Sequence, residues 1–254
     1  MSDQPNQSLY GGEPAPSGGG QPKPLGLMDI LSGLFSEPVA LFKRLAAEPR
    51  WVGALIAYIA LSLALSIVWA LRVDALEFAY MALDSASQRL GSLSAAQIDQ
   101  MAEMQAKFLP VGTVFGSLIA TPAVIFLSGL VFWAVGLISK EGPQWKPTYP
   151  HGLVVATIPG LAAAPYFLLG AIMALINPVG TLRPDQLSPS SLSFWLETDS
   201  SKLSALYSSI DLFLLISYVM VFLAAKYALR AKTWGAALCV FLALAAPLLR
   251  ILFA

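Results

Sequence analysis

Long runs without a charged side chain constrain this sequence more than any other feature. The segments Trp51–Leu71, Phe108–Ser139 and Pro147–Leu182 contain no Asp, Glu, Lys or Arg. Only 12% of the 254 residues are charged, whereas soluble proteins average about 25%. A helix needs roughly 20 apolar residues to cross the hydrocarbon core of a bilayer, and in lipid it satisfies its own backbone hydrogen bonds. The sequence therefore predicts an all-α polytopic membrane helix bundle.

Five segments are apolar enough and long enough to be transmembrane helices. They are Trp51–Leu71, a stretch within Phe108–Ser139, His151–Ile176, Leu203–Ala225 and Thr233 to the C-terminus. We therefore expect residues 51–254 to form one membrane domain with five transmembrane helices.

The lysines and arginines near the ends of these segments predict the orientation of the chain. Nine of them lie in the N-terminal region or in the short connections after the second and fourth segments, and six lie on the other side. Because the nine are concentrated next to the spans, we expect the N-terminus to be cytoplasmic and the C-terminus to lie outside.

The region before the first span divides into two parts. Residues 1–25 are rich in Pro, Gly and Ser, a composition that cannot offset the entropy lost on ordering, so we expect a disordered tail. In residues 26–50, apolar side chains recur at helical spacing and the pattern breaks at Pro38. Two interpretations fit this amphipathic segment: an interfacial helix along the cytoplasmic leaflet, or a helix docked on the bundle itself.

Two longer outer loops are expected, at residues 72–107 and 178–202. In the first loop, Ser94 and Gln97 have the spacing of a capping box, which predicts a helix that begins there. The second loop contains several prolines and should be mostly irregular. Within the second span, Gly112 and Gly116 form a G-x-x-x-G motif that predicts a helix-packing face.

No constellation of catalytic residues appears in the sequence. The single histidine, His151, excludes a metal site built from two histidines. Neither a G-x-S-x-G elbow nor a G-x-x-x-x-G-K-[ST] phosphate loop is present. His151 stands at the cytoplasmic mouth of the third span, where it is solvated, bonded to a neighbour or part of a proton relay. We expect no enzymatic activity, no cofactor and no metal, and a net charge of zero gives no argument for nucleic acid.

Asp211 raises a separate question, because an ionised carboxylate is costly in hydrocarbon. If the fourth helix begins near Leu203, Asp211 lies about two turns inside its outer end. Arg250 approaches the same end of the fifth helix. Asp211 either pairs with Arg250 near the outer rim, or lies alone in the headgroup region, or belongs to an ion pathway.

Two stretches of the sequence resemble the Yip domain family, in its bacterial branch. The first, "SEPVALFKRLAAEPRW" at residues 36–51, is similar to that family's cytoplasmic segment before the first span, with matching positions Pro38, Phe42, Arg44 and Pro49. The second resembles its penultimate span, which opens with an Asp-x-Phe pattern, here Asp211 and Phe213.

The resemblance implies a five-span membrane protein with a cytoplasmic N-terminus. It also implies a non-enzymatic membrane scaffold, adaptor or membrane-organising factor. The alternative is a small permease or an accessory subunit of an exporter that uses the proline-bent spans and Asp211. We expect the partners to be the lipid bilayer and another membrane protein or a second copy. The expected location is a bacterial inner membrane, or the ER or Golgi membrane in a eukaryote.

Overall fold

The computed structural model describes residues 24–90, 94–177, 188–196, 198 and 200–253. Within these ranges every regular element is a helix, and only two isolated β-bridges accompany them. The helices are α1 Leu27–Ser36, α2 Pro38–Ala47, α3 Val52–Arg72, α4 Ala75–Leu90, α5 Ala95–Ser139, α6 Tyr149–Leu161, α7 Ala164–Ile176, α8 Leu192–Trp195, α9 Ser201–Ser209, α10 Leu212–Tyr227 and α11 Thr233–Phe253.

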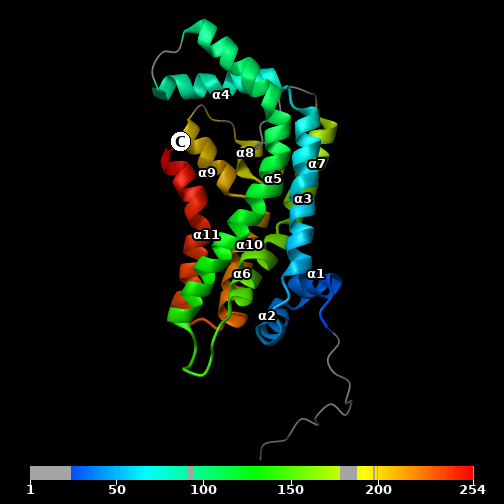
Figure 1. Ribbon diagram of the computed structural model, residues 1–254, viewed down its shortest axis with the longest axis vertical. Coiled ribbons are helices and arrows are strands. Elements are labelled where there is room, and N and C mark those ends of the chain that lie inside the picture. The colour runs from blue at the N-terminus through cyan, green and yellow to red at the C-terminus, as the bar shows by residue number, and fades with distance from the viewer. Residues whose placement is uncertain (1–23, 91–93, 178–187, 197, 199, 254) are drawn as a thin grey trace, which may run out of the picture.

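The helices form an elongated bundle with two distinct ends (Figure 1). Helices α1 and α2 lie at one end, which we call the α2 end, and α4 with the first part of α5 lies at the other, the α4 end. The chain runs along the bundle in α3 and returns in α5. It then runs through α6 and α7, returns in α10 and ends in α11, so the C-terminus lies toward the α4 end (Figure 1).

Helix α6 lies at the centre of the main core. Its side chains Val154, Val155 and Ile158 have no exposed surface and cluster with Phe132 of α5 and Phe42 of α2. A helix that is apolar on all sides is expected at such a central position. The core therefore joins the N-terminal segment to the spans.

Glycines allow α5 and α6 to approach closely. A Cβ atom added at Gly152 would lie 2.1 Å from the carbonyl oxygen of Gly129, and one added at Gly129 would lie 2.6 Å from a methyl carbon of Leu153. By contrast, no atom lies within 4 Å of a Cβ built at Gly112 or Gly116. Among the described residues no neighbour packs closely on Gly112 or Gly116, so a packing face there stays a prediction, and the bundle packs through different glycines.

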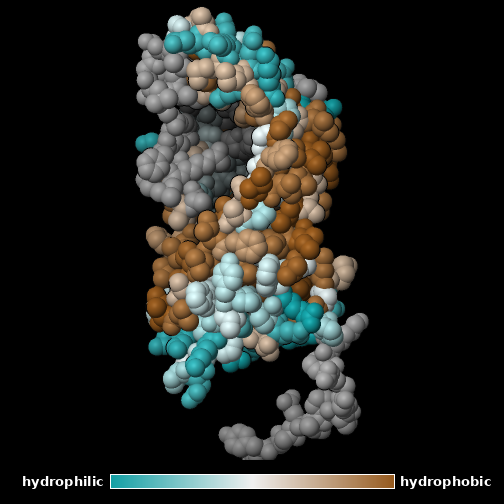
Figure 2. Space-filling view, in the orientation of Figure 1, coloured by the Kyte–Doolittle hydropathy of each residue, from teal (hydrophilic) through white to brown (hydrophobic). Residues whose placement is uncertain are grey.

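The surface has the distribution expected of a membrane protein. On the face shown in Figure 2, hydrophobic residues cover much of the middle of the bundle and hydrophilic residues gather at both ends. Among the described residues, α3 and α5 are long and apolar enough to cross a membrane, and α6 with α7 qualifies if the bent pair is one span. The prediction of a membrane helical protein is therefore confirmed for two or three of the five segments.

The predicted outer loop at residues 72–107 is largely helical. Ser94 caps α5 with the predicted capping box, since its hydroxyl accepts from Gln97 N and the Gln97 side chain accepts from Ser94 N. The helix that begins there continues without a break to Ser139, about 68 Å along its axis. Helix α4 packs on its first turns through Ala79 and Leu83. The helix predicted to begin at Ser94 is confirmed, and it continues into the second predicted span because nothing between residues 95 and 139 ends it.

The third predicted span, His151–Ile176, is two helices. Helices α6 and α7 meet at an angle of 42°. The amides of Ala162 and Ala163 donate to carbonyl oxygens three residues earlier in the chain, not four as in an α-helix. Pro165 has no N–H to continue the ladder of α6. The bend expected from the prolines is present, as a break rather than a curve.

The fourth predicted span, Leu203–Ala225, is also interrupted. Helix α9 ends at Ser209 and α10 begins at Leu212, so Asp211 is not two turns inside a helix. Helix α10 is about 24 Å long, which is shorter than the roughly 30 Å hydrocarbon core. Of the outer loop predicted at 178–202, residues 178–187 lie outside the described residues, and α8 and the start of α9 are helical.

The N-terminal segment 26–50 is docked on the bundle. Leu34 of α1 and Phe42 and Leu45 of α2 have no exposed surface and belong to the main core, and α2 contacts α6 and α10. This is the second of the two interpretations of the amphipathic pattern. The predicted disordered tail extends too far, because Leu25 is buried in the same core; residues 1–23 lie outside the described residues.

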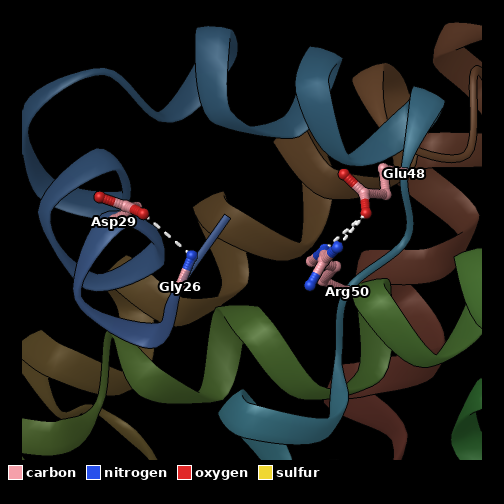
Figure 3. A network of polar contacts seen from close by, with 4 residues as sticks. All are labelled: Gly26, Asp29, Glu48 and Arg50. Atoms are coloured by element: carbon pink, nitrogen blue, oxygen red, sulfur yellow. Dashed lines mark hydrogen bonds and ion pairs between the residues drawn. The ribbon is translucent and has the colours of Figure 1, made fainter. Parts of the chain in front are cut away.

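Local polar contacts fix the ends of α1 and α2 (Figure 3). The Asp29 carboxylate accepts a hydrogen bond of 2.9 Å from Gly26 N at the start of α1. After α2, Arg50 forms an ion pair with Glu48, in which its Nε donates to Glu48 Oε1 at 2.7 Å. These two contacts are exposed, so they orient the chain locally rather than add much stability.

Candidate functional site

Two connections far apart in the sequence pair with each other at the α2 end. The connection after α5 pairs with the turn between α10 and α11 through an antiparallel bridge between Lys140 and Ala231. Glu141 N donates to Arg230 O at 2.8 Å, and Lys232 N donates to Ser139 O at 2.6 Å. Backbone bonds therefore hold this junction, which the sequence alone does not indicate.

His151 connects α6 to α2. Its Nδ1 accepts a hydrogen bond of 3.1 Å from Thr148 N, which assigns the ring proton of the neutral form to Nε2. Nε2 then donates to Ala46 O, 3.1 Å away at the end of α2. Since carbonyls in the last turn of a helix have no partner within the helix, His151 satisfies one of them and fixes α2 in place.

Trp145 contacts both His151 and Arg230. Its ring makes an edge-to-face contact with the His151 ring at 5.3 Å, and the Arg230 guanidinium lies 4.3 Å from its centroid. Trp145 Nε1 also donates to Leu229 O at 2.7 Å. Trp145 thus couples the α5–α6 connection to the α10–α11 turn, and through His151 to α2.

The N-terminal residues that match the Yip pattern lie on α2 or just after it. Pro38 is in the first turn of α2, where its missing N–H is not needed. Phe42 is fully buried, whereas Arg44 is exposed, and Pro49 follows the helix. Helix α2 therefore has one face fixed in the core and one face directed away from it.

The exposed side of α2 has a shallow groove that is mainly apolar, with a charged side chain at each end. A groove of about 460 Å³ is lined by Glu37, Pro38, Val39, Ala40 and Lys43. The Lys43 ammonium lies 5.6 Å from the ring centroid of Tyr227, which ties this face to the end of α10.

Asp211 is the N-cap of α10. Its Oδ1 accepts hydrogen bonds from the backbone N–H groups of Phe213 at 2.8 Å and Leu214 at 3.2 Å. Its Oδ2 accepts from the hydroxyls of Ser188 at 3.0 Å and Ser190 at 2.5 Å. Asp211 has no exposed surface, and four hydrogen bonds offset the cost of burying its carboxylate.

The predicted site residues divide between two places. His151 lies with Pro38, Phe42, Arg44 and Pro49 at the α2 end, whereas Asp211 and Phe213 lie at the α9–α10 junction toward the α4 end (Figure 1). The predicted pairing of Asp211 with Arg250 stays a prediction, because the Arg250 side chain lies outside the described side chains.

The polar groups at both places are engaged within the bundle. The described residues contain no group of three His, Cys, Asp or Glu side chains that could hold a metal ion. Both oxygen atoms of Asp211 and both ring nitrogens of His151 already have hydrogen-bond partners. The arrangement is suited to holding helices and presenting a surface.

Sequence reasoning missed Trp145, Arg230, Ser188 and Ser190. Trp145 and Arg230 stand in two polar connections whose pairing depends on the folded bundle. An aspartate directly before an apolar run is a helix-start signal, so the capping role of Asp211 could have been inferred from the sequence.

Comparison with known proteins gives one match. A family model described as the Yip1 domain matches residues 32–254. No curated protein and no solved structure matches the chain. The match includes α2, the α2-end junction and Asp211.

Proposed function

Because this chain belongs to the Yip1 domain family, a family of non-enzymatic membrane proteins, we propose that it is a membrane scaffold or adaptor whose α2 end binds a partner. The observation that carries the proposal is the division of α2 into two faces. Phe42 and Leu45 are fully buried in the core, while Lys43 and Arg44 are exposed. A surface that is already fixed loses little conformational entropy on binding.

We further propose that the chain crosses the membrane five times, with the α2 end on the cytoplasmic side. The course of the chain along the bundle supports this topology (Figure 1), as does the excess of Lys and Arg near the α2 end. The short helix α10 is accommodated by local thinning of the bilayer. The membrane is a bacterial inner membrane, or the ER or Golgi membrane in a eukaryote.

Site-specific photocrosslinking tests the partner-binding role. A photoreactive residue is placed at Arg44 on the exposed face of α2, and a matched control is placed at Gln100, an exposed position of α5 at the α4 end. Native membranes are irradiated, solubilised in mild detergent and analysed by affinity capture and mass spectrometry. We expect one abundant crosslinked membrane protein, or a second copy of this chain, from Arg44 and not from Gln100.

Crosslinks of equal yield and variety at both positions would contradict the proposal, because they indicate random collisions. Proteoliposome flux measurements separate it from the permease alternative. Ion- or pH-dependent flux that disappears in Asp211→Asn would favour a transporter over a scaffold.

A further inference from the structure

Three cations at the α2 end form no ion pair with any residue that the structure describes. We call Lys140, Arg230 and Lys232 the basic junction. Lys140 follows α5 directly, and Lys232 precedes α11 directly. The bridge between Lys140 and Ala231, with the bond from Lys232 N to Ser139 O, fixes these residues at neighbouring backbone positions. Arg230 adopts a left-handed backbone conformation, with φ of 51°, so the fold holds the junction at some conformational cost.

The described carboxylates do not neutralise the basic junction by ion pairs. The nearest carboxylate along the chain, Glu141, forms its ion pair with Lys226 instead. In the part of the chain that the structure describes, Lys140, Arg230 and Lys232 form no ion pair. The Arg230 guanidinium instead lies over the face of the Trp145 ring. Like charges held together are unfavourable unless an anion joins them.

The basic junction lies at the ends of apolar helices, where lipid headgroups are expected in the proposed topology. Lys140 and Lys232 adjoin the ends of two apolar helices, α5 and α11. Trp234, in the first turn of α11, is 51% exposed, and tryptophan is enriched at the boundary between hydrocarbon and headgroups. We therefore expect Lys140 and Lys232, at the ends of these apolar helices, to lie near the phosphate groups of lipids.

We propose that the basic junction is a binding site for the headgroup of an anionic phospholipid. The lysine ammonium groups and the Arg230 guanidinium are suited to a phosphate oxygen as charge-assisted donors, and Trp234 borders the acyl-chain region. A zwitterionic lipid carries a compensating ammonium group, so it gains less from three adjacent cations. The site therefore selects anionic over zwitterionic phospholipid in the leaflet at the α2 end.

Native mass spectrometry of the full chain tests this site. The protein is reconstituted into nanodiscs that contain phosphatidylglycerol and phosphatidylcholine in equal amounts, released into mild detergent and analysed for retained lipid. We expect preferential retention of phosphatidylglycerol. The double variant Lys140→Gln/Lys232→Gln should weaken this retention by on the order of tenfold, given the contribution expected for each basic residue.

Two control variants make the result specific. Lys107→Gln/Lys202→Gln removes two cations near the α4 end and should leave lipid retention unchanged. Lys140→Arg/Lys232→Arg keeps the charges and should preserve the preference, which separates loss of charge from damage to the fold. Equal retention of the two lipids by the unmodified protein, or an equal loss in the α4-end variant, would overturn the proposal.

Discussion

Gly152 has no room for a side chain, because the carbonyl oxygen of Gly129 would lie 2.1 Å from its Cβ. Gly152→Ala should destabilise the protein by about 1–3 kcal/mol, since α5 and α6 must move apart. The apparent melting temperature of the purified protein in detergent measures this effect.

Gly116→Ala is the matched control, because a Cβ there meets no atom within 4 Å. It should leave the melting temperature unchanged or raise it slightly, since alanine favours helix more than glycine does. A larger loss in Gly116→Ala than in Gly152→Ala would contradict the packing described above.

Asp211 gives a second prediction at this scale. Asp211→Ala removes the cap of α10 and the carboxylate oxygen that accepts from the hydroxyls of Ser188 and Ser190, so it should cost about 2 kcal/mol or more. Asp211→Asn keeps one oxygen that can cap the helix and should be milder. Thermal unfolding of both variants checks the order, and equal losses would show that the cap contributes little.

A double-mutant cycle tests the predicted contact between Asp211 and Arg250. If the two side chains pair, the double variant Asp211→Asn/Arg250→Gln should lose less stability than the sum of the single variants. Additive losses, measured by unfolding in the same detergent, would show that the hydrogen bonds to Asp211 act without Arg250.

At the scale of elements, α2 depends on one aromatic anchor. Phe42 has no exposed surface, so Phe42→Ala should cost about 3–5 kcal/mol and loosen α2. Hydrogen exchange of the α2 amides should rise. Phe35→Ala on α1 is the matched control, because Phe35 is 58% exposed and its loss should change stability by less than about 0.5 kcal/mol. Unchanged exchange in Phe42→Ala would show that α2 is held mainly by other contacts.

The helical character of most elements could be predicted from the sequence, because apolar runs and capping residues act locally. The start of α5 at Ser94 and the break at Pro38 are examples. The continuity of α5 could not be predicted, because a polar helical segment followed by an apolar one does not show whether the helix is interrupted between them. The break before α10 was missed because Asp211 was assigned to a helix interior rather than to a cap.

Contacts between distant segments could not be predicted. The bond from His151 to Ala46 O and the stacking of Arg230 on Trp145 join positions 105 and 85 residues apart. No periodic pattern encodes such pairs, since they form only when the helices pack. The sequence therefore indicated His151 as a candidate but not its role.

For the whole molecule, the central claim is a bundle that spans the bilayer with its α2 end and α4 end on opposite sides. The apolar middle and polar ends of the surface (Figure 2) support this arrangement. It also underlies the two proposals, since both place the α2 end at one membrane surface.

Labelling of single cysteines with a membrane-impermeant maleimide tests this claim most directly. In a Cys239→Ala background, Gln144→Cys reports the α2 end and Gln100→Cys reports the α4 end, both at exposed positions. We predict that Gln144→Cys reacts only from the cytoplasmic side and Gln100→Cys only from the opposite side. Labelling of both cysteines from the same side would contradict the account.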